Sequence, residues 1–305
     1  MAIPTSRTKA NAQIIITPDK CTGCGLCISV CKDNSLRLEK KKVKVNPEAV
    51  FGCYGCCHCM AICPTNAIKI AGRKVNEDAI IELPHKLNNA TYEQLFSLLQ
   101  HRRSIRNFVN KEIESGVIEK ILNASLTAPM GIPPSDVHIL IINGREKTRA
   151  FTSDFSNYLK GLRLITSKPA LLLMRLFSGK AIYELFNGFI APLFDVYTSE
   201  FDKGKNYITY DAPLLMYFYG SPYSDPADPI IAATYAMIAA ESLGLGTCML
   251  GAIHPFIQNG KKADEFRNKH KIKHKSKEGL FLAIGYPAVK YNKGIRRTFA
   301  SIDYI

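Results

Sequence analysis

The sequence has 305 residues, of which 47% are hydrophobic, and its formal net charge is +14. A chain of this length can bury one large core and a smaller second core, so we expect one large and one small domain. It contains no apolar run of about 18 residues, as a membrane-spanning helix needs, and no apolar segment of the secretion-signal type near residue 1, so we expect a cytoplasmic protein.

Part of the positive charge lies in two lysine-rich stretches, whose members are Lys40, Lys41, Lys42 and Lys44, and Lys269, Lys271, Lys273, Lys275 and Lys277. Such stretches are typical of a solvated surface, or of a basic face that docks an acidic electron carrier. The count treats every cysteine as neutral, so thiolate-bound clusters and a bound phosphate would lower it. Because no nucleic-acid-binding motif accompanies the charge, we expect no nucleic-acid partner.

Eight of the ten cysteines form two runs of identical spacing, C-x2-C-x2-C-x3-C. The first run is Cys21, Cys24, Cys27 and Cys31, and the second is Cys53, Cys56, Cys59 and Cys63. In a reducing compartment such thiols are metal ligands rather than disulfides. Paired C-x2-C motifs also bind zinc, but four evenly spaced cysteines, twice, exceed what tetrahedral zinc requires.

Over residues 14–72 this pattern resembles the bacterial two-cluster ferredoxins, in which the fourth cysteine of each run binds the cluster of the other run. The resemblance implies one [4Fe–4S] cluster on Cys21, Cys24, Cys27 and Cys63, and a second on Cys53, Cys56, Cys59 and Cys31. It also implies a small α+β domain, which we place at 1–72, with two short hairpins whose outer strands lie in 12–17 and 67–70, and a helical turn after each cysteine loop.

Two residues depart from the ferredoxin pattern. Lys32 follows Cys31, where ferredoxins usually have proline. Cys57 is an additional thiol, which we interpret as a small buried hydrophobic residue, with a redox role as the alternative.

After a polar linker at 73–90 that contains Pro84, Thr91 and Gln94 fit a helix capping box. Tyr92, Leu95, Phe96 and Leu99 form an apolar stripe on that helix. The helix leads into a basic cluster of Arg102, Arg103, Ser104 and Arg106, whose forked donors suit a phosphate, although a basic helix end is often only solvated.

Three segments, RRSIRNF at 102–108, ASLTAP at 124–129 and ESLGLGTCMLG at 241–251, resemble the FMN-dependent nitroreductase family, and the likeness extends over 91–305. It implies an α+β fold with an antiparallel-dominated mixed sheet ringed by helices, and a homodimer with FMN in the interface. Runs at 137–143, 212–220 and 279–285 predict strands, and 228–243 predicts a long helix in the dimer core.

The same resemblance implies the flavin site. Arg102, Ser104 and Arg106, with Arg103 nearby, would hold the phosphate and ribityl chain. Leu250 and Gly251 would lie beside the flavin, Gly251 through its backbone amide. The remaining implied contacts are Pro129, Ser135 in place of a glutamine, and Arg296 or Arg297. Pro133 stands where the family often has asparagine, and Cys248 and His254 we interpret as packing residues.

Residues 155–200 are both apolar and basic. We interpret them as a helical insertion that folds over the flavin and shapes the substrate pocket, with an amphipathic membrane-surface element as the less favoured alternative.

Together these features predict an oxidoreductase of anaerobic metabolism that passes electrons from an external donor through two clusters to FMN, and then to a small organic acceptor such as a nitroaromatic, quinone or enoate. The donor is reduced ferredoxin or NAD(P)H; no G-x-G-x-x-G motif follows a predicted strand, so a nicotinamide would have to react directly at the flavin. The alternative is a non-catalytic electron-transfer or redox-sensing protein.

Overall fold

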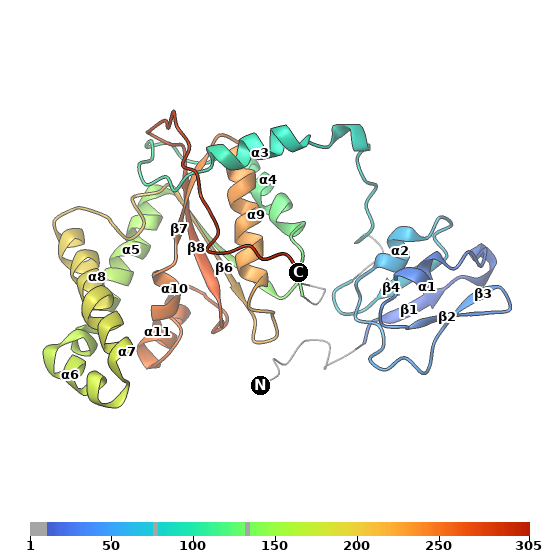
Figure 1. Cartoon of the computed structure of the whole chain (residues 1–305), viewed down its shortest axis with the longest axis horizontal. Coiled ribbons are helices and arrows are strands. Elements are labelled where there is room, and N and C mark those ends of the chain that lie inside the picture. The colour runs from blue at the N-terminus through green and yellow to red at the C-terminus, as the bar shows by residue number, and fades with distance from the viewer. Residues whose placement is uncertain (1–10, 76–78, 132–134) are drawn as a thin grey trace. The chain divides into compact units, whose positions relative to one another are not determined.

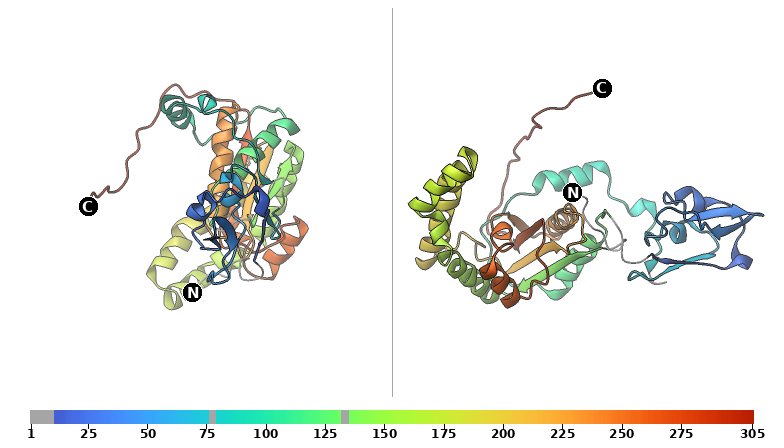
Figure 2. Two further views of the ribbon diagram at one scale, coloured as in Figure 1. Left: turned by 90° about the vertical axis from the view of Figure 1, so that its right-hand side faces the viewer. Right: turned by 90° about the horizontal axis from the view of Figure 1, so that it is seen from below.

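The computed structural model describes residues 11–75, 79–131 and 135–305. The chain divides into two compact units (Figures 1 and 2). The first consists of the residues up to Ala90 together with 129–138 and 220–228, and the second of 91–128, 139–219 and 229–305. The first unit therefore contains two segments that the sequence assigns to the second domain.

The N-terminal unit contains two small antiparallel sheets and two short helices. Strand β1 (Gln13–Ile16) pairs with β4 (Ile68–Ala71), and β2 (Leu36–Glu39) pairs with β3 (Lys42–Val45). The prediction of two hairpins is therefore wrong for one of them: only β2 and β3 form a hairpin, whereas the two outer strands pair with each other, Ile14 opposite Ile70. Alternating apolar residues identify a strand but do not identify its partner.

Each cysteine run contributes one helical turn, as predicted. Helix α1 (Leu26–Val30) precedes Cys31, and α2 (His58–Ile62) precedes Cys63. A short 3₁₀ turn, Pro18–Lys20, leads into the first run. The turns and strands enclose one core, which includes Leu36, Val43, Met60, Ile68 and Ile70 together with several of the cysteines.

The second unit begins with helix α3 (Tyr92–His101), which is preceded by the 3₁₀ turn Lys86–Asn88. The predicted capping box is present: the Gln94 amide donates to Thr91 Oγ1 at 3.3 Å, and the Thr91 amide donates to Gln94 Oε1 at 3.0 Å. Arg102 caps the C-terminal end, so the predicted basic cluster starts where the helix stops. The apolar stripe of α3 is largely exposed in the single chain, with 45% of Phe96 accessible.

Four strands form the central sheet in the order β5 (Val137–Asn143), β6 (Leu214–Gly220), β8 (Gly279–Gly285) and β7 (Gly246–Leu250). β8 runs antiparallel to both β6 and β7, and every residue of β6 and β8 is buried. Ser104 adds a parallel bridge to Thr247 at the β7 edge. The predicted strands and the predicted α+β, antiparallel-dominated mixed sheet are confirmed.

Helices cover both faces of this sheet (Figure 1). On one face Tyr217 stacks on Phe281, with 3.9 Å between ring centroids, and Phe151 of α5 (Arg145–Lys160) packs against Phe281. Helices α10 (Ile253–Phe256) and α11 (Lys261–Lys269) lie on the same side. On the other side are α4 (Ser115–Leu126) and α9 (Asp228–Ser242), which confirms the long helix predicted at 228–243.

Residues 161–200 are almost entirely helical. They form a 3₁₀ turn, Arg163–Thr166, then α6 (Lys168–Phe177), α7 (Lys180–Leu185) and α8 (Ala191–Asp195), with π-helical turns at Phe186–Ile190 and Val196–Glu200. Leu172, Leu176 and Phe177 are exposed on α6. Across the described residues, no helix is both long enough and apolar enough to cross a membrane.

The chain after β8 contains neither helix nor strand and is exposed from residue 288 onward. Figure 2 shows this C-terminal segment leaving the sheet as an extended arm.

Candidate cofactor sites

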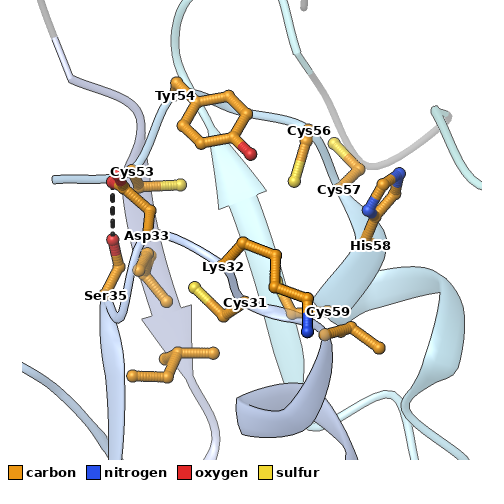
Figure 3. A pocket seen from close by; sticks show the side chains of 13 residues that line it. Cys31, Lys32, Asp33, Ser35, Cys53, Tyr54, Cys56, Cys57, His58 and Cys59 are labelled. Carbon is orange, nitrogen blue, oxygen red and sulfur yellow. Dashed lines mark hydrogen bonds between the residues drawn. The ribbon is translucent and has the colours of Figure 1, made fainter. Parts of the chain in front are cut away.

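The eight regularly spaced cysteines line two separate cavities, four in each. Cys21, Cys24, Cys27 and Cys63 line the first, which holds about 300 Å³ of space unoccupied by protein atoms. Cys31, Cys53, Cys56 and Cys59 line the second, with about 380 Å³ (Figure 3). We call these the Cys21 cavity and the Cys31 cavity. Each combines three cysteines of one run with the fourth cysteine of the other, the crossed grouping that the ferredoxin resemblance implies.

Left-handed backbone bends each run around its cavity. Gly23 (φ +75°) and Gly55 (φ +81°) occupy equivalent positions in the two runs. The next equivalent pair, Gly25 (φ 77°) and Cys57 (φ 62°), caps the N-terminal ends of α1 and α2. Cys57 thus stands in a left-handed position where the first run has glycine, a conformation that costs a residue with a Cβ about 1 kcal/mol.

The thiols of the Cys31 cavity lie close together, and Cys59 is buried whereas Cys31, Cys53 and Cys56 are half-buried. Burial, followed by the proximity of Cys53, Cys56 and Cys31, raises the pKa of Cys59 to about 12. Without a metal the Cys59 thiol therefore stays protonated, and metal ligation would displace its proton. Four thiolates this close together would repel one another, so only bound metal cations would make the deprotonated state of all four favourable.

Cys63 has a different environment. Burial acts to raise its pKa, but hydrogen bonds from the Thr65, Ala67 and Ile68 amides outweigh burial and lower it. The Ala67 amide donates to Cys63 Sγ at 3.3 Å. These donors favour a thiolate in the Cys21 cavity.

Within the described part of the chain, no group of three or more His, Cys, Asp or Glu side chains is close enough to hold a single metal ion. A [4Fe–4S] cluster does not require such a group, because each of its four thiolates binds a different iron atom. The donor set of both cavities, four cysteines each, fits a cluster.

The two residues that depart from the ferredoxin pattern both line the Cys31 cavity, together with Asp33, Tyr54 and His58 (Figure 3). Lys32 is exposed at the cavity edge. Cys57 is half-buried, and its thiol donates to the Gly55 carbonyl at 3.4 Å. Burial, and then Cys56 and Cys53, raise the pKa of Cys57.

In the second unit, four of the predicted phosphate-binding residues line one hollow that is open to solvent. They are Arg102 and Arg103 after α3, and Arg296 and Arg297 on the C-terminal segment. Phe96, Leu99, Tyr291 and Ile295 supply apolar and aromatic surface to the same hollow. Arginines beside aromatic surface can bind a ligand that carries a phosphate and a flat ring.

Ser104 and Arg106 lie on the chain segment that runs beside β7. The Ile105 amide donates to the Thr247 carbonyl at 2.9 Å, and Gly246 has no room for a side chain because a Cβ there would lie 2.5 Å from Ile105 Cγ1. The strand beside this segment ends at Leu250, which is buried, and the chain continues to the exposed Gly251. A Cβ on Gly251 would have no atom within 4 Å, so its backbone is open to a ligand.

Pro129 and Ser135 belong to the other compact unit. Ser135 Oγ accepts a hydrogen bond from the Val137 amide at 3.1 Å, so the hydroxyl that the sequence offered as a flavin contact has a local partner. Pro133 lies outside the described residues.

The sequence did not reveal the surroundings of Arg106. Its guanidinium lies 5.7 Å from the ring centroid of Tyr210, and its pKa is raised, first by Cys248 and then by Tyr210. Burial raises the pKa of the Cys248 thiol although Arg106 opposes this. No sequence pattern links residues about a hundred positions apart, so only the fold reveals the contact. By contrast, His254 is a packing residue as expected: it is buried, and its Nδ1 lies 2.9 Å from the Tyr217 hydroxyl.

These units define an α+β protein in which a small domain with ferredoxin-type cysteines precedes a sheet-and-helix domain. Residues 99–286 match the model of the Nitroreductase family, and residues 13–64 match the 4Fe-4S dicluster domain. The first match covers more than half of the sequence, so the chain belongs to the nitroreductase family.

Solved structures with a similar fold include a nitroreductase with bound FMN from Bacteroides fragilis NCTC 9343, which is 17% identical, with a TM-score of 0.50 over 70% of this chain and 98% of that one. A nitroreductase with bound FMN from Desulfitobacterium hafniense DCB-2 is also 17% identical, with a TM-score of 0.49 over 69% of this chain and 97% of that one. The first of these likenesses supports the fold assignment. A comparison with curated proteins found no match.

Proposed function

We propose that the protein is an iron–sulfur flavoprotein oxidoreductase that takes electrons from an external donor, passes them through two [4Fe–4S] clusters to FMN, and reduces a small organic acceptor such as a nitroaromatic, a quinone or an enoate. The observation that carries the proposal is the division of the eight cysteines into two cavities with four thiols each. A family whose solved members include FMN-bound nitroreductases supplies the second half of the proposal.

When bound, the clusters carry single electrons, and FMN supplies the conversion of two such electrons and a proton into a hydride equivalent. The residues of this chain have separate tasks. In the Cys21 cavity the ligands are Cys21, Cys24, Cys27 and Cys63, and in the Cys31 cavity they are Cys31, Cys53, Cys56 and Cys59.

For FMN, we propose that Arg102, Arg103, Ser104 and Arg106 hold the phosphate and ribityl chain, with Arg296 or Arg297 as an additional phosphate contact. Leu250 packs beside the ring, and the Gly251 amide hydrogen-bonds to it; Pro129 and Ser135 complete the predicted contacts. Support comes from the four arginines around one hollow and from the open backbone at Gly251.

We also propose a homodimer. Helix α9 is apolar around most of its circumference and carries only Asp228 and Glu241 as charged residues. A helix of this kind is normally covered on all sides. The exposed apolar stripe of α3 offers further surface for a second copy.

The experiment is a pair of neighbouring substitutions, Cys59→Ser and Cys57→Ser, made in protein purified anaerobically. The parent should contain about eight irons and one FMN per chain. Cys59→Ser removes a proposed ligand, so it should lose up to about half of the iron or shift that cluster's potential, and it should keep FMN. Cys57→Ser changes a thiol in the same loop and should keep the full iron content.

Turnover then tests the electron path. With reduced ferredoxin as donor, Cys59→Ser should lose most activity, whereas a donor that reduces FMN directly should still support turnover. Equal loss with both donors would indicate a folding role for the N-terminal unit. Stoichiometric zinc, or no flavin, would refute the proposed function itself.

A further inference from the structure

The turn between β2 and β3 has an unusual composition for its geometry. Lys40 (φ 46°) and Lys41 (φ 61°) are both left-handed, and Glu39 pairs with Lys42 to close the two-residue turn. Turns of this geometry favour Asn-Gly, because each left-handed residue with an ordinary side chain costs about 1 kcal/mol. Two lysines at these positions therefore weaken the hairpin locally, which points to a role outside it.

The hairpin is also strongly basic. Over 36–45 it carries five basic residues and a single acidic one: Arg37, Lys40, Lys41, Lys42, Lys44 and Glu39. Glu39 is bound on both sides, by Arg37 at 2.5 Å and Lys44 at 3.0 Å. Among the described residues, Lys40 and Lys41 form no ion pair, and both are exposed at the tip. The tip therefore presents uncompensated positive charge to solvent.

This turn contacts the first cysteine loop directly. A Cβ on Gly23 would lie only 2.1 Å from the Lys41 carbonyl oxygen, so the two backbones are in close contact. Lys42 Nζ donates to the Cys21 carbonyl at 2.7 Å and to the Pro18 carbonyl at 2.8 Å, and Val43 lines the Cys21 cavity. Cys24, in the same loop, is exposed. A molecule bound at the tip would thus lie beside the most accessible ligand of the Cys21 cavity.

We propose that the β2–β3 hairpin is the docking surface for an acidic one-electron carrier protein, and that electrons reach this chain at the Cys21 cavity. This inference rests on the proposed function, because it assumes a cluster in that cavity. Each docking event oxidises the donor by one electron and reduces this chain by one electron.

Two features favour a protein over another polyanion. Leu38 and Val45 are about half exposed, at 49% and 47%, on the face of the hairpin opposite Arg37 and Lys44, so apolar surface adjoins the basic tip, and protein interfaces combine the two. The charged tip also lies against the loop that carries the exposed Cys24, and electrostatic steering toward such a redox site increases the rate of productive encounter by tenfold or more.

The test is the double variant Lys40→Asn/Lys41→Gly, which removes both charges and supplies the residues that the turn geometry prefers. We expect the hairpin to become no less stable, so that iron content and thermal stability are retained or increased. The probe is a purified acidic 2Fe–2S ferredoxin, reduced beforehand and mixed anaerobically with the oxidised holoprotein in a stopped-flow instrument. At low ionic strength the second-order rate of cluster reduction should fall about tenfold, and the difference should disappear at high salt.

Lys271→Gly/Lys273→Asn is a matched control in the second unit. It also removes two exposed lysines, one of which is left-handed at φ 56°. Its rate with ferredoxin should stay near that of the parent. Dithionite is a small anionic donor that needs no docking surface, so at high salt, where charge steering is screened, it should reduce all three proteins at one rate. Failure of dithionite to reduce any of them would instead refute the proposed function.

An unchanged ferredoxin rate in the hairpin variant would overturn the inference, as would an equal fall in the control, which would mean that total charge alone matters. If the hairpin variant kept the parent's rate with ferredoxin but lost binding to vesicles of anionic phospholipid or to duplex DNA, the hairpin would serve a different partner. That result would equally overturn the inference.

Discussion

Replacing Gly23 by alanine tests the close contact between the first cysteine loop and the β2–β3 turn. A Cβ at Gly23 would lie 2.1 Å from the Lys41 carbonyl oxygen and 2.9 Å from its carbon, and the residue is left-handed at φ +75°. The obstructing atoms are backbone, so they cannot move aside by a change of rotamer.

Gly25→Ala is the matched control, because Gly25 has nearly the same φ, +77°, and nothing within 4 Å of its Cβ position. Both variants share the left-handed cost of about 1 to 2 kcal/mol. Only Gly23→Ala adds the overlap with Lys41, which we expect to bring its destabilisation at least about 2 kcal/mol above that of the control.

The assay is the rate at which the cluster absorbance bleaches in anaerobic buffer with an iron chelator and mild denaturant. Since about 1.4 kcal/mol corresponds to a factor of ten, Gly23→Ala should release iron more than about tenfold faster than Gly25→Ala. Bleaching of both variants at one rate would show that the Lys41 carbonyl does not restrict this position, and the inferred contact between loop and hairpin would fail with it.

Three further predictions follow from individual residues. Cys57→Gly should keep the full iron content, because Cys57 is not a proposed ligand, and should stabilise the N-terminal unit by about 1 kcal/mol, because glycine adopts the left-handed conformation without strain. Slower bleaching of the cluster absorbance would confirm the stabilisation, whereas loss of iron would identify Cys57 as a ligand. Arg106→Ala should weaken FMN binding by about 1.5 to 3 kcal/mol, measured as faster loss of flavin on dialysis, and unchanged affinity would place the phosphate elsewhere. Burial lowers the pKa of His254 below its usual 6.5. As the pH falls below about 6.5, the unfolded chain therefore takes up this proton before the folded chain does, and the free energy of unfolding decreases. Chemical denaturation followed by circular dichroism should show that this free energy depends less on pH in His254→Gln.

The sequence predicted well what depends on short-range chemistry. The capping box at Thr91 and Gln94 needs only two side chains one helical turn apart, and its hydrogen bonds are present. The buried strands were visible as apolar runs bounded by breakers, and β8 occupies the predicted residues 279–285. The grouping of four cysteines around each cavity is the one that the ferredoxin resemblance implies, in which each run supplies the fourth cysteine of the other.

What the sequence could not predict depends on the tertiary fold. The pairing of β1 with β4 joins strands about fifty residues apart, and nothing in either strand specifies the other. The contact of Arg106 with Tyr210 and Cys248 arises because the segment after α3 runs beside β7. Likewise, the left-handed conformation of Cys57 is apparent only when its φ is compared with that of Gly25, the equivalent residue of the first run.

The two cysteine cavities have the same set of proposed ligands but different surroundings, and the difference bears on the direction of electron flow. Lys32, Asp33 and His58 line the Cys31 cavity, whereas the described lining of the Cys21 cavity contains no ionisable side chain besides its cysteines. Nearby charges and solvent exposure set the reduction potential of a cluster. At the Cys31 cavity Lys32 stabilises the added negative charge of a reduced cluster and Asp33 opposes it, whereas the basic turn of Lys40, Lys41 and Lys42 lies against the loop of the Cys21 cavity. Clusters held in these cavities would therefore differ in potential, and a redox titration that resolves the two would show in which of them electrons collect.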